Sequence, residues 1–121
     1  GYAVLSMTHE GRDIRQWLNA RGFTCCLLQY RMPRGHHDVP LSDALQAIRI
    51  VREHSQEWGI AQVGIMGSSA GGHLASTAAT HYTEDSRPDF QILFYQHLIL
   101  HHFQRGLQLL NQNLCICSTL E

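Results

Sequence analysis

The sequence contains no lysine, and its nine basic residues are all arginine. Ten acidic residues balance them, so the formal net charge is -1 at pH 7, without the basic surplus typical of nucleic-acid-binding proteins. No apolar run approaches the ~20 residues that a membrane-spanning helix needs, and no signal-peptide pattern opens the chain. We therefore expect a soluble protein that binds no nucleic acid and spans no membrane. Its compartment is not indicated.

The chain has 121 residues, of which 44% are hydrophobic, so it forms at most one globular domain. It begins at Gly1-Tyr2 without an initiator methionine, which indicates an internal piece of a longer protein.

Cysteine is scarce and occurs as Cys25-Cys26 and as Cys115-x-Cys117. The first pair lies in an apolar run with strand character, where a buried free thiol is the usual outcome. Adjacent residues of a strand face opposite sides, so these two cysteines cannot bind one metal ion together. The second pair would need further ligands that the spacing does not supply. We therefore expect no metal site and no cofactor.

Apolar spacing predicts helices and strands in alternation. The expected helices are 7–20, 41–58 and 70–82, and the expected strands are 23–30, 62–66 and 90–95. Ser42 is the expected cap of the second helix, and Gly59 its end. This alternation is typical of an α/β fold in which helices cover both faces of a parallel sheet, a three-layer arrangement. Ligands of such sheets bind beyond the carboxyl ends of the strands.

The most informative stretch is a G-x-S-x-G pentapeptide, Gly67 to Gly71, between the strand 62–66 and the helix 70–82. This context predicts a nucleophile elbow, in which Ser69 stands at the apex of a sharp turn that Gly67 and Gly71 make possible. The amino end of the following helix favours a developing oxyanion, and the backbone N–H of Ala70 is an expected donor to it. The alternative is a glycine-rich loop without chemistry.

The character of the sequence changes at Gln96. Residues 96–121 are rich in Leu, Gln, His and Asn, and no further alternation of strands and helices is evident. A loose amphipathic helix around Leu107, Leu110 and Leu114 is one interpretation. We therefore divide the chain into a core, 1–95, and a tail of uncertain structure, 96–121, whose origin in a frameshift or misjoined segment is a hypothesis.

Residues 1–95 resemble the α/β-hydrolases of the acetyl-esterase/lipase-like group, near the bacterial carbohydrate and xylan-associated esterases. The most specific matches are GSSAGGHLAS (Gly67 to Ser76), RPDF (Arg87 to Phe90), Trp58-Gly59-Ile60 and His9-Glu10-Gly11. The resemblance implies a partial α/β-hydrolase fold, incomplete at both ends. It also implies that Ser69 is the catalytic serine, that Ala70 is an oxyanion donor, and that Gly1 is the last glycine of the oxyanion loop.

The general base and its carboxylate are not matched, because the family's catalytic Asp and His lie beyond residue 121. His73 is one helical turn past Ser69 and projects along the helix, which favours a packing or surface role. A substitute triad of Asp89 with His97, His101 or His102 would keep the usual order of the three residues.

The first hypothesis is therefore a serine carboxylic-ester hydrolase with an acyl-enzyme mechanism, acting on a small ester, with an acylated carbohydrate among the candidates. Only the nucleophile half of its site is present. The alternative is an inactive fragment that self-associates through exposed sheet edges. Acyl transfer and peptide hydrolysis on the same elbow form a third option.

Overall fold

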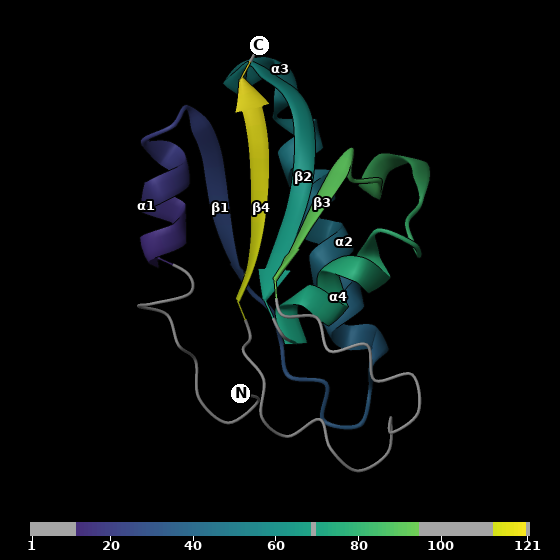
Figure 1. Ribbon diagram of the computed structural model, residues 1–121. Helices are drawn as coiled ribbons and strands as arrows, with labels where there is room; N and C mark the ends of the chain where they lie inside the picture. Colours follow the sequence, from purple (N-terminus) through teal and green to yellow (C-terminus); the bar gives the residue numbers. More distant parts are fainter. Residues whose placement is uncertain (1–11, 69, 95–112, 121) are drawn as a thin grey trace.

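The computed structural model describes residues 12–68, 70–94 and 113–120 (Figure 1). Its helices are α1 (Asp13–Asn19), α2 (Asp38–Glu53), α3 (Ser55–Trp58), α4 (Ala70–Ala78) and the short 3₁₀ turn η2 (Glu84–Ser86). Its strands are β1 (Phe23–Gln29), β2 (Ile60–Ser68), β3 (Phe90–Phe94) and β4 (Asn113–Leu120).

The four strands form one mixed sheet in the order β1-β4-β2-β3. Strands β2 and β3 are parallel, with Cα pairs from Gly64↔Phe90 to Ser68↔Phe94. Strand β4 is antiparallel to both of its neighbours. Because β1 and β2 both oppose β4, they run in the same direction, and the carboxyl ends of β1, β2 and β3 lie at one edge of the sheet (Figure 1).

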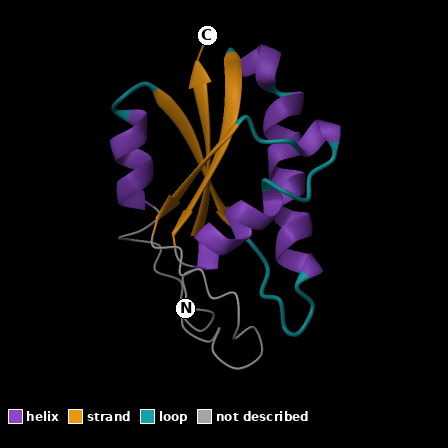
Figure 2. Ribbon diagram, turned by 45° about the vertical axis from the view of Figure 1, so that its right-hand side comes forward, coloured by secondary structure: helices purple, strands orange, loops and turns teal. Residues whose placement is uncertain are grey.

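Helices cover both faces of the sheet, as Figures 1 and 2 show: α1 lies on one side, and α2 and α4 on the other. The larger core lies under α2 and α4, and its fully buried members include Ile48, Val63 and Ile65. The smaller core, under α1, consists of Leu18, Cys25 and Met66. The three-layer α/β arrangement expected from the sequence is therefore confirmed.

Helix α2 begins three residues earlier than expected, at Asp38, so that Pro40 lies within its first turn. A proline is tolerated there because the first backbone N–H groups of a helix have no intrahelical acceptor. The expectation that Ser42 caps this helix is wrong, since the cap position is His37. Gly59 ends the segment in a left-handed conformation, as expected.

Part of the tail, Asn113–Leu120, forms strand β4. The amphipathic helix expected around Leu114 is wrong at that residue, which lies in β4, while Leu107 and Leu110 are outside the described residues. The segment NLCICSTL contains Ile, Cys and Thr, residue types with better strand than helix propensity. Backbone pairing with two strands then decides the conformation.

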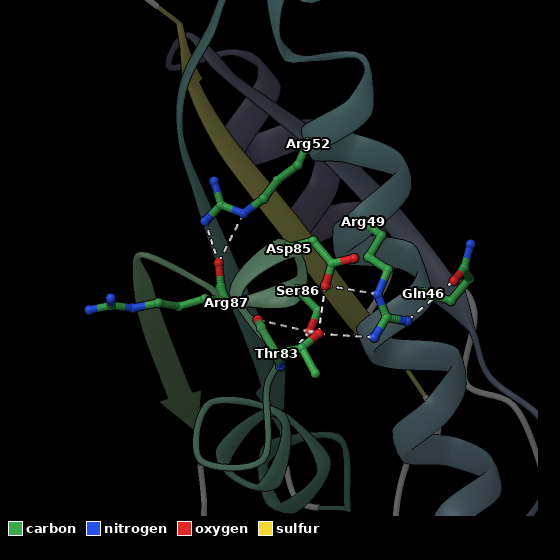
Figure 3. A network of polar contacts seen from close by, with 7 residues as sticks. All are labelled: Gln46, Arg49, Arg52, Thr83, Asp85, Ser86 and Arg87. Carbon is green, nitrogen blue, oxygen red and sulfur yellow. Dashed lines mark hydrogen bonds and ion pairs between the residues drawn. The ribbon is translucent and has the colours of Figure 1, made fainter.

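A polar network anchors the segment before β3 to helix α2 (Figure 3). The Arg49 guanidinium donates to Asp85 Oδ1 and to Thr83 Oγ1, each at 3.2 Å. Arg52 donates to the backbone carbonyl of Arg87 at 3.0 Å. Ser86, inside the network, is fully buried. These contacts hold the segment that leads into β3 against α2.

Candidate active site at the carboxyl edge of the sheet

The turn between β2 and α4 is as short as the elbow prediction requires. Strand β2 ends at Ser68 and helix α4 begins at Ala70, which leaves one residue between them. A Cβ atom on Gly67 would lie 2.1 Å from the carbonyl oxygen of Gly71 and 2.6 Å from the backbone nitrogen of Gly72. The end of the strand and the first turn of the helix are therefore in direct backbone contact.

The amino end of α4 faces the carboxyl edge of the sheet. Ala70, Gly71 and Gly72 are all buried there, and Ser68 is paired with Phe94 at the end of the parallel pair. The first N–H groups of a helix lack intrahelical acceptors and carry the positive end of its dipole. The amino end of α4 can therefore stabilise negative charge close to it.

The structure tests the predicted site residues unequally. Gly67 and Gly71 lie close together, and Ala70 occupies the first position of α4, but the elbow role of the two glycines stays a prediction. Ser69 and Gly1 lie outside the described residues, as do the histidines of the substitute triad, His97, His101 and His102. The catalytic role of Ser69 and the donor roles of Ala70 and Gly1 consequently remain predictions.

The Asp89 carboxylate makes contacts that stabilise the fold, which differ from the catalytic role proposed for it in the substitute triad. Its carboxylate oxygen Oδ2 accepts from the backbone N–H of Val63 at 2.8 Å and from Arg52 at 3.2 Å. It precedes β3, whereas the elbow adjoins the other end of that strand, roughly 16 Å away at ~3.3 Å per residue. Asp89 holds the amino end of β3 against β2 and is not placed to orient a base at the carboxyl edge of the sheet.

His73 lies on the more exposed side of α4, one turn after its start. Partial burial of its ring lowers the pKa of His73, and the nearby His37 lowers it further. The neutral imidazole is thus favoured. The exposed position agrees with the surface role expected for His73. Because His37 acts on His73, the loop before α2 lies close to the first turns of α4.

That loop is held by an ion pair between Arg31 and Asp43. The guanidinium donates to both carboxylate oxygens, at 2.8 Å for Nη2 to Oδ1, and the Arg31 backbone N–H donates to Oδ2 at 2.9 Å. The hydrogen bond from Arg31 lowers the pKa of the Asp43 carboxyl group. The chain that leaves β1 at the carboxyl edge is therefore tied to α2.

Replacing Asp43 with asparagine should lower the free energy of unfolding at pH 7 by about 1 kcal/mol, because Arg31 is largely exposed to solvent. A carboxyl group whose pKa is lower in the folded state stabilises the fold above its unfolded pKa of ~3.9, and this contribution is lost as the pH falls through the folded value. The variant should therefore lose less stability in acid than the parent. Urea unfolding at pH 7 and pH 3 measures this, with Glu53→Gln, an exposed site on α2, as the control. Equal acid sensitivity of D43N and the parent would contradict it.

A cavity of about 720 Å³ opens at the same edge, on the α1 side of the sheet. It is lined mainly by apolar side chains of α1, β2 and β3: Asp13, Ile14, Trp17, Leu18, Met66, Ser68, Ile92 and Phe94. Trp17 of α1 is 55% exposed, although Leu18 beside it in the sequence is buried. No local pattern could have shown the cavity, since its walls come from three separate segments.

Neither a metal site nor a membrane span is evident in the described part of the chain. Among residues 12–68, 70–94 and 113–120, no three His, Cys, Asp or Glu side chains are grouped so as to hold a metal ion. No helix of those residues is long and apolar enough to cross a bilayer.

A layered α/β fold in which a strand turns directly into a helix at the carboxyl edge is the arrangement of the α/β-hydrolase class. The comparisons agree, because the family model of BD-FAE matches residues 4–104. The chain belongs to the BD-FAE family, the bifunctional feruloyl/acetyl xylan esterases of the α/β-hydrolase class.

Two curated relatives support this membership. An acetylxylan esterase of Xylanibacter ruminicola is 46% identical over 97 residues, which cover 78% of this chain and 20% of that protein. Endo-1,4-beta-xylanase B of Butyrivibrio fibrisolvens is 30% identical over 98 residues, which cover 74% of this chain and 15% of that protein. The chain thus spans a fifth or less of the relatives' length. No solved structure matches it.

Proposed function

We propose that the chain carries the nucleophile part of a serine carboxylic-ester hydrolase that removes acyl groups from xylan or a similar carbohydrate. The observation that carries the proposal is the backbone contact between Gly67 and Gly71, with one residue between β2 and α4. A turn this tight presents the intervening side chain at the mouth of a helix. The sequence has a serine at that position.

In the proposed reaction, the Ser69 hydroxyl oxygen attacks the acyl carbonyl carbon while its proton passes to a general base. The carbonyl oxygen becomes an oxyanion, which the backbone N–H of Ala70, and by resemblance that of Gly1, stabilise by hydrogen bonds. The C–O bond to the sugar then breaks and leaves an acyl-serine, which water hydrolyses to release the acid. The chain's own part is the nucleophile and the oxyanion donors.

The test is covalent labelling with a fluorophosphonate, which phosphonylates serines that a general base activates. Because this chain holds the nucleophile half of the site, the labelled protein is a longer one that contains the chain together with the rest of the fold. It should be labelled once, and peptide mapping should place the label on Ser69. A folded protein of this kind that takes up no label, or takes it up elsewhere, would overturn the proposal.

The apolar cavity is the proposed site for the acyl group. It reaches Ser68, the neighbour of Ser69, and its volume lies in the range of pockets that enclose drug-sized ligands. An aromatic acyl group of the feruloyl kind would occupy far more of that space than an acetyl group. The aromatic walls, Trp17 and Phe94, suit a ring.

Phe94→Ala should therefore weaken binding of ferulic acid by about 5- to 10-fold, the effect of losing one aromatic contact of about 1 kcal/mol. Phe94 is 44% exposed, so the change should leave the fold intact. The matched control is Tyr82→Ala, an exposed aromatic outside the cavity. Calorimetric titration measures both affinities. Equal weakening in the two variants, or none in F94A, would remove the cavity from the proposal.

A second candidate function, an inactive fragment that self-associates, draws on one specific observation. Strand β3 is at an edge of the sheet, and two of its apolar side chains, Ile92 and Phe94, are exposed. Such an edge favours pairing with another chain. Size-exclusion chromatography together with the labelling test separates the two candidates, because a monomer that is labelled at Ser69 fits only the first.

A further inference from the structure

The apolar cavity has two aromatic side chains in its lining, Trp17 from α1 and Phe94 from β3. Trp17 is 55% exposed, so packing against the rest of the protein fixes its indole ring only in part. An aromatic side chain that is free to change rotamer must be ordered when a ligand binds, and that loss of freedom opposes binding. How well Trp17 serves as a wall of the cavity therefore depends on what holds its ring in place.

Arg21, one helical turn after Trp17, makes two contacts that hold this ring. Its guanidinium carbon Cζ lies 3.6 Å from the centroid of the Trp17 ring, which is a cation–π contact. The same guanidinium donates from Nη1 to the backbone carbonyl oxygen of Trp17 at 3.0 Å. Arg21 covers one face of the ring and is not among the residues that line the cavity, so the cavity meets the edge of the ring or its other face.

The end of helix α1 makes this arrangement possible. The last carbonyl groups of a helix have no intrahelical donor, and the backbone N–H of Arg21 donates to the carbonyl of Leu18 at 2.9 Å. The Arg21 guanidinium takes the Trp17 carbonyl instead, at the negative end of the helix dipole, where a cation is favoured. Because this hydrogen bond is to the backbone, it fixes the guanidinium, and the ring in contact with the guanidinium is fixed as well.

We infer that Arg21 is a positioning residue, which holds Trp17 in place as a wall of the cavity and thereby favours planar aromatic acyl groups. This inference rests on the proposed function, in which the cavity receives the acyl group. Arg21 acts through Trp17 and does not touch the ligand. A ring that enters the cavity meets a wall that is already ordered, so less freedom is lost on binding. An acetyl group has no ring to place against Trp17 and gains much less from it.

Calorimetric titration with ferulic acid tests the inference without using catalysis. Arg21→Gln should weaken binding about 2- to 5-fold, the effect of losing one exposed cation–π contact. The matched control is Arg15→Gln, which removes the same charge from an exposed position of the same helix, outside the cavity lining. It should bind as the parent does. Equal affinities of R21Q and the parent, or an equal loss in R15Q, would overturn the inference.

Two further readouts separate a positioning role from a purely structural one. In Trp17→Ala the ring is absent, so W17A and W17A/R21Q should bind ferulic acid equally. In Trp58→Phe, Trp17 is the only tryptophan, and its steady-state fluorescence anisotropy should be lower in W58F/R21Q than in W58F/R15Q. A further loss of affinity from R21Q in the W17A background, or equal anisotropies, would show that Arg21 does not act by holding the Trp17 ring.

These outcomes also distinguish a failure of the inference from a failure of the proposed function. If the parent binds no ferulic acid, the assignment of the cavity to the acyl group is wrong, and the inference is wrong with it. If Ser69 takes up no fluorophosphonate while R21Q still weakens binding, only the esterase proposal is overturned. If the parent binds ferulic acid and R21Q binds it equally well, only the role of Arg21 is overturned.

Discussion

Alanine at position 67 should unfold the chain or bring it close to unfolding. The added Cβ would lie 2.1 Å from the Gly71 carbonyl oxygen and 2.2 Å from its carbonyl carbon, well inside contact distance. Both atoms belong to the backbone of α4, so no change of side-chain rotamer can relieve the overlap, and the helix must move away from the end of β2. Overpacking of this kind costs about 3 kcal/mol or more, a large part of the ~5–15 kcal/mol that stabilises a typical domain.

Gly72→Ala is the matched control for Gly67→Ala. It lies on the other side of the same contact, but its added Cβ would be 3.1 Å from the Gly67 carbonyl oxygen, a distance that a small shift corrects. Alanine also has the higher helix propensity. Urea unfolding should therefore show a much smaller change for G72A than for G67A. Similar stability of G67A and the parent would mean that the two segments are not packed together as described.

The layers of helices and the close succession of β2 and α4 were predictable because their signals are local, whereas the nucleophile elbow itself stays a prediction. A strand pattern, a G-x-S-x-G pentapeptide and a helical pattern follow one another without interruption. The close approach of Gly67 and Gly71 is the reason for the two glycines. Alternation of helices and strands likewise predicted helices on both faces of the sheet, since such alternation has few other compact solutions.

Strand β4 was not predictable in this way. Its partners, β1 and β2, are far away in the sequence, and its own segment has no strict alternation of apolar and polar residues. Pairing on both sides supplies backbone hydrogen bonds that no local pattern reports. The buried free thiol expected at Cys25 is wrong, because Cys25 is disulfide-bonded, and no local pattern reports such a bond.

The apolar cavity could also not be predicted from the sequence. Leu18 of α1 is buried against the sheet. Trp17 instead borders open space, because α1 covers only part of its face of the sheet and leaves the ends of β2 and β3 accessible. How far a helix extends over a sheet is a tertiary property, and periodicity does not encode it.

Ser69→Ala should abolish labelling by a fluorophosphonate and any ester hydrolysis that the protein supports. Removing the nucleophile from a complete serine-hydrolase site costs on the order of a millionfold in turnover, so the residual signal should equal that of the reagent alone. The neighbouring Ser68 offers a sharp control, since it has the same side chain one position earlier and lines the cavity from the end of β2. Ser68→Ala should retain labelling, while both variants keep the parent's circular dichroism spectrum. If S68A lost the label and S69A kept it, the nucleophile would be the last residue of the strand, and the proposed elbow geometry would be wrong.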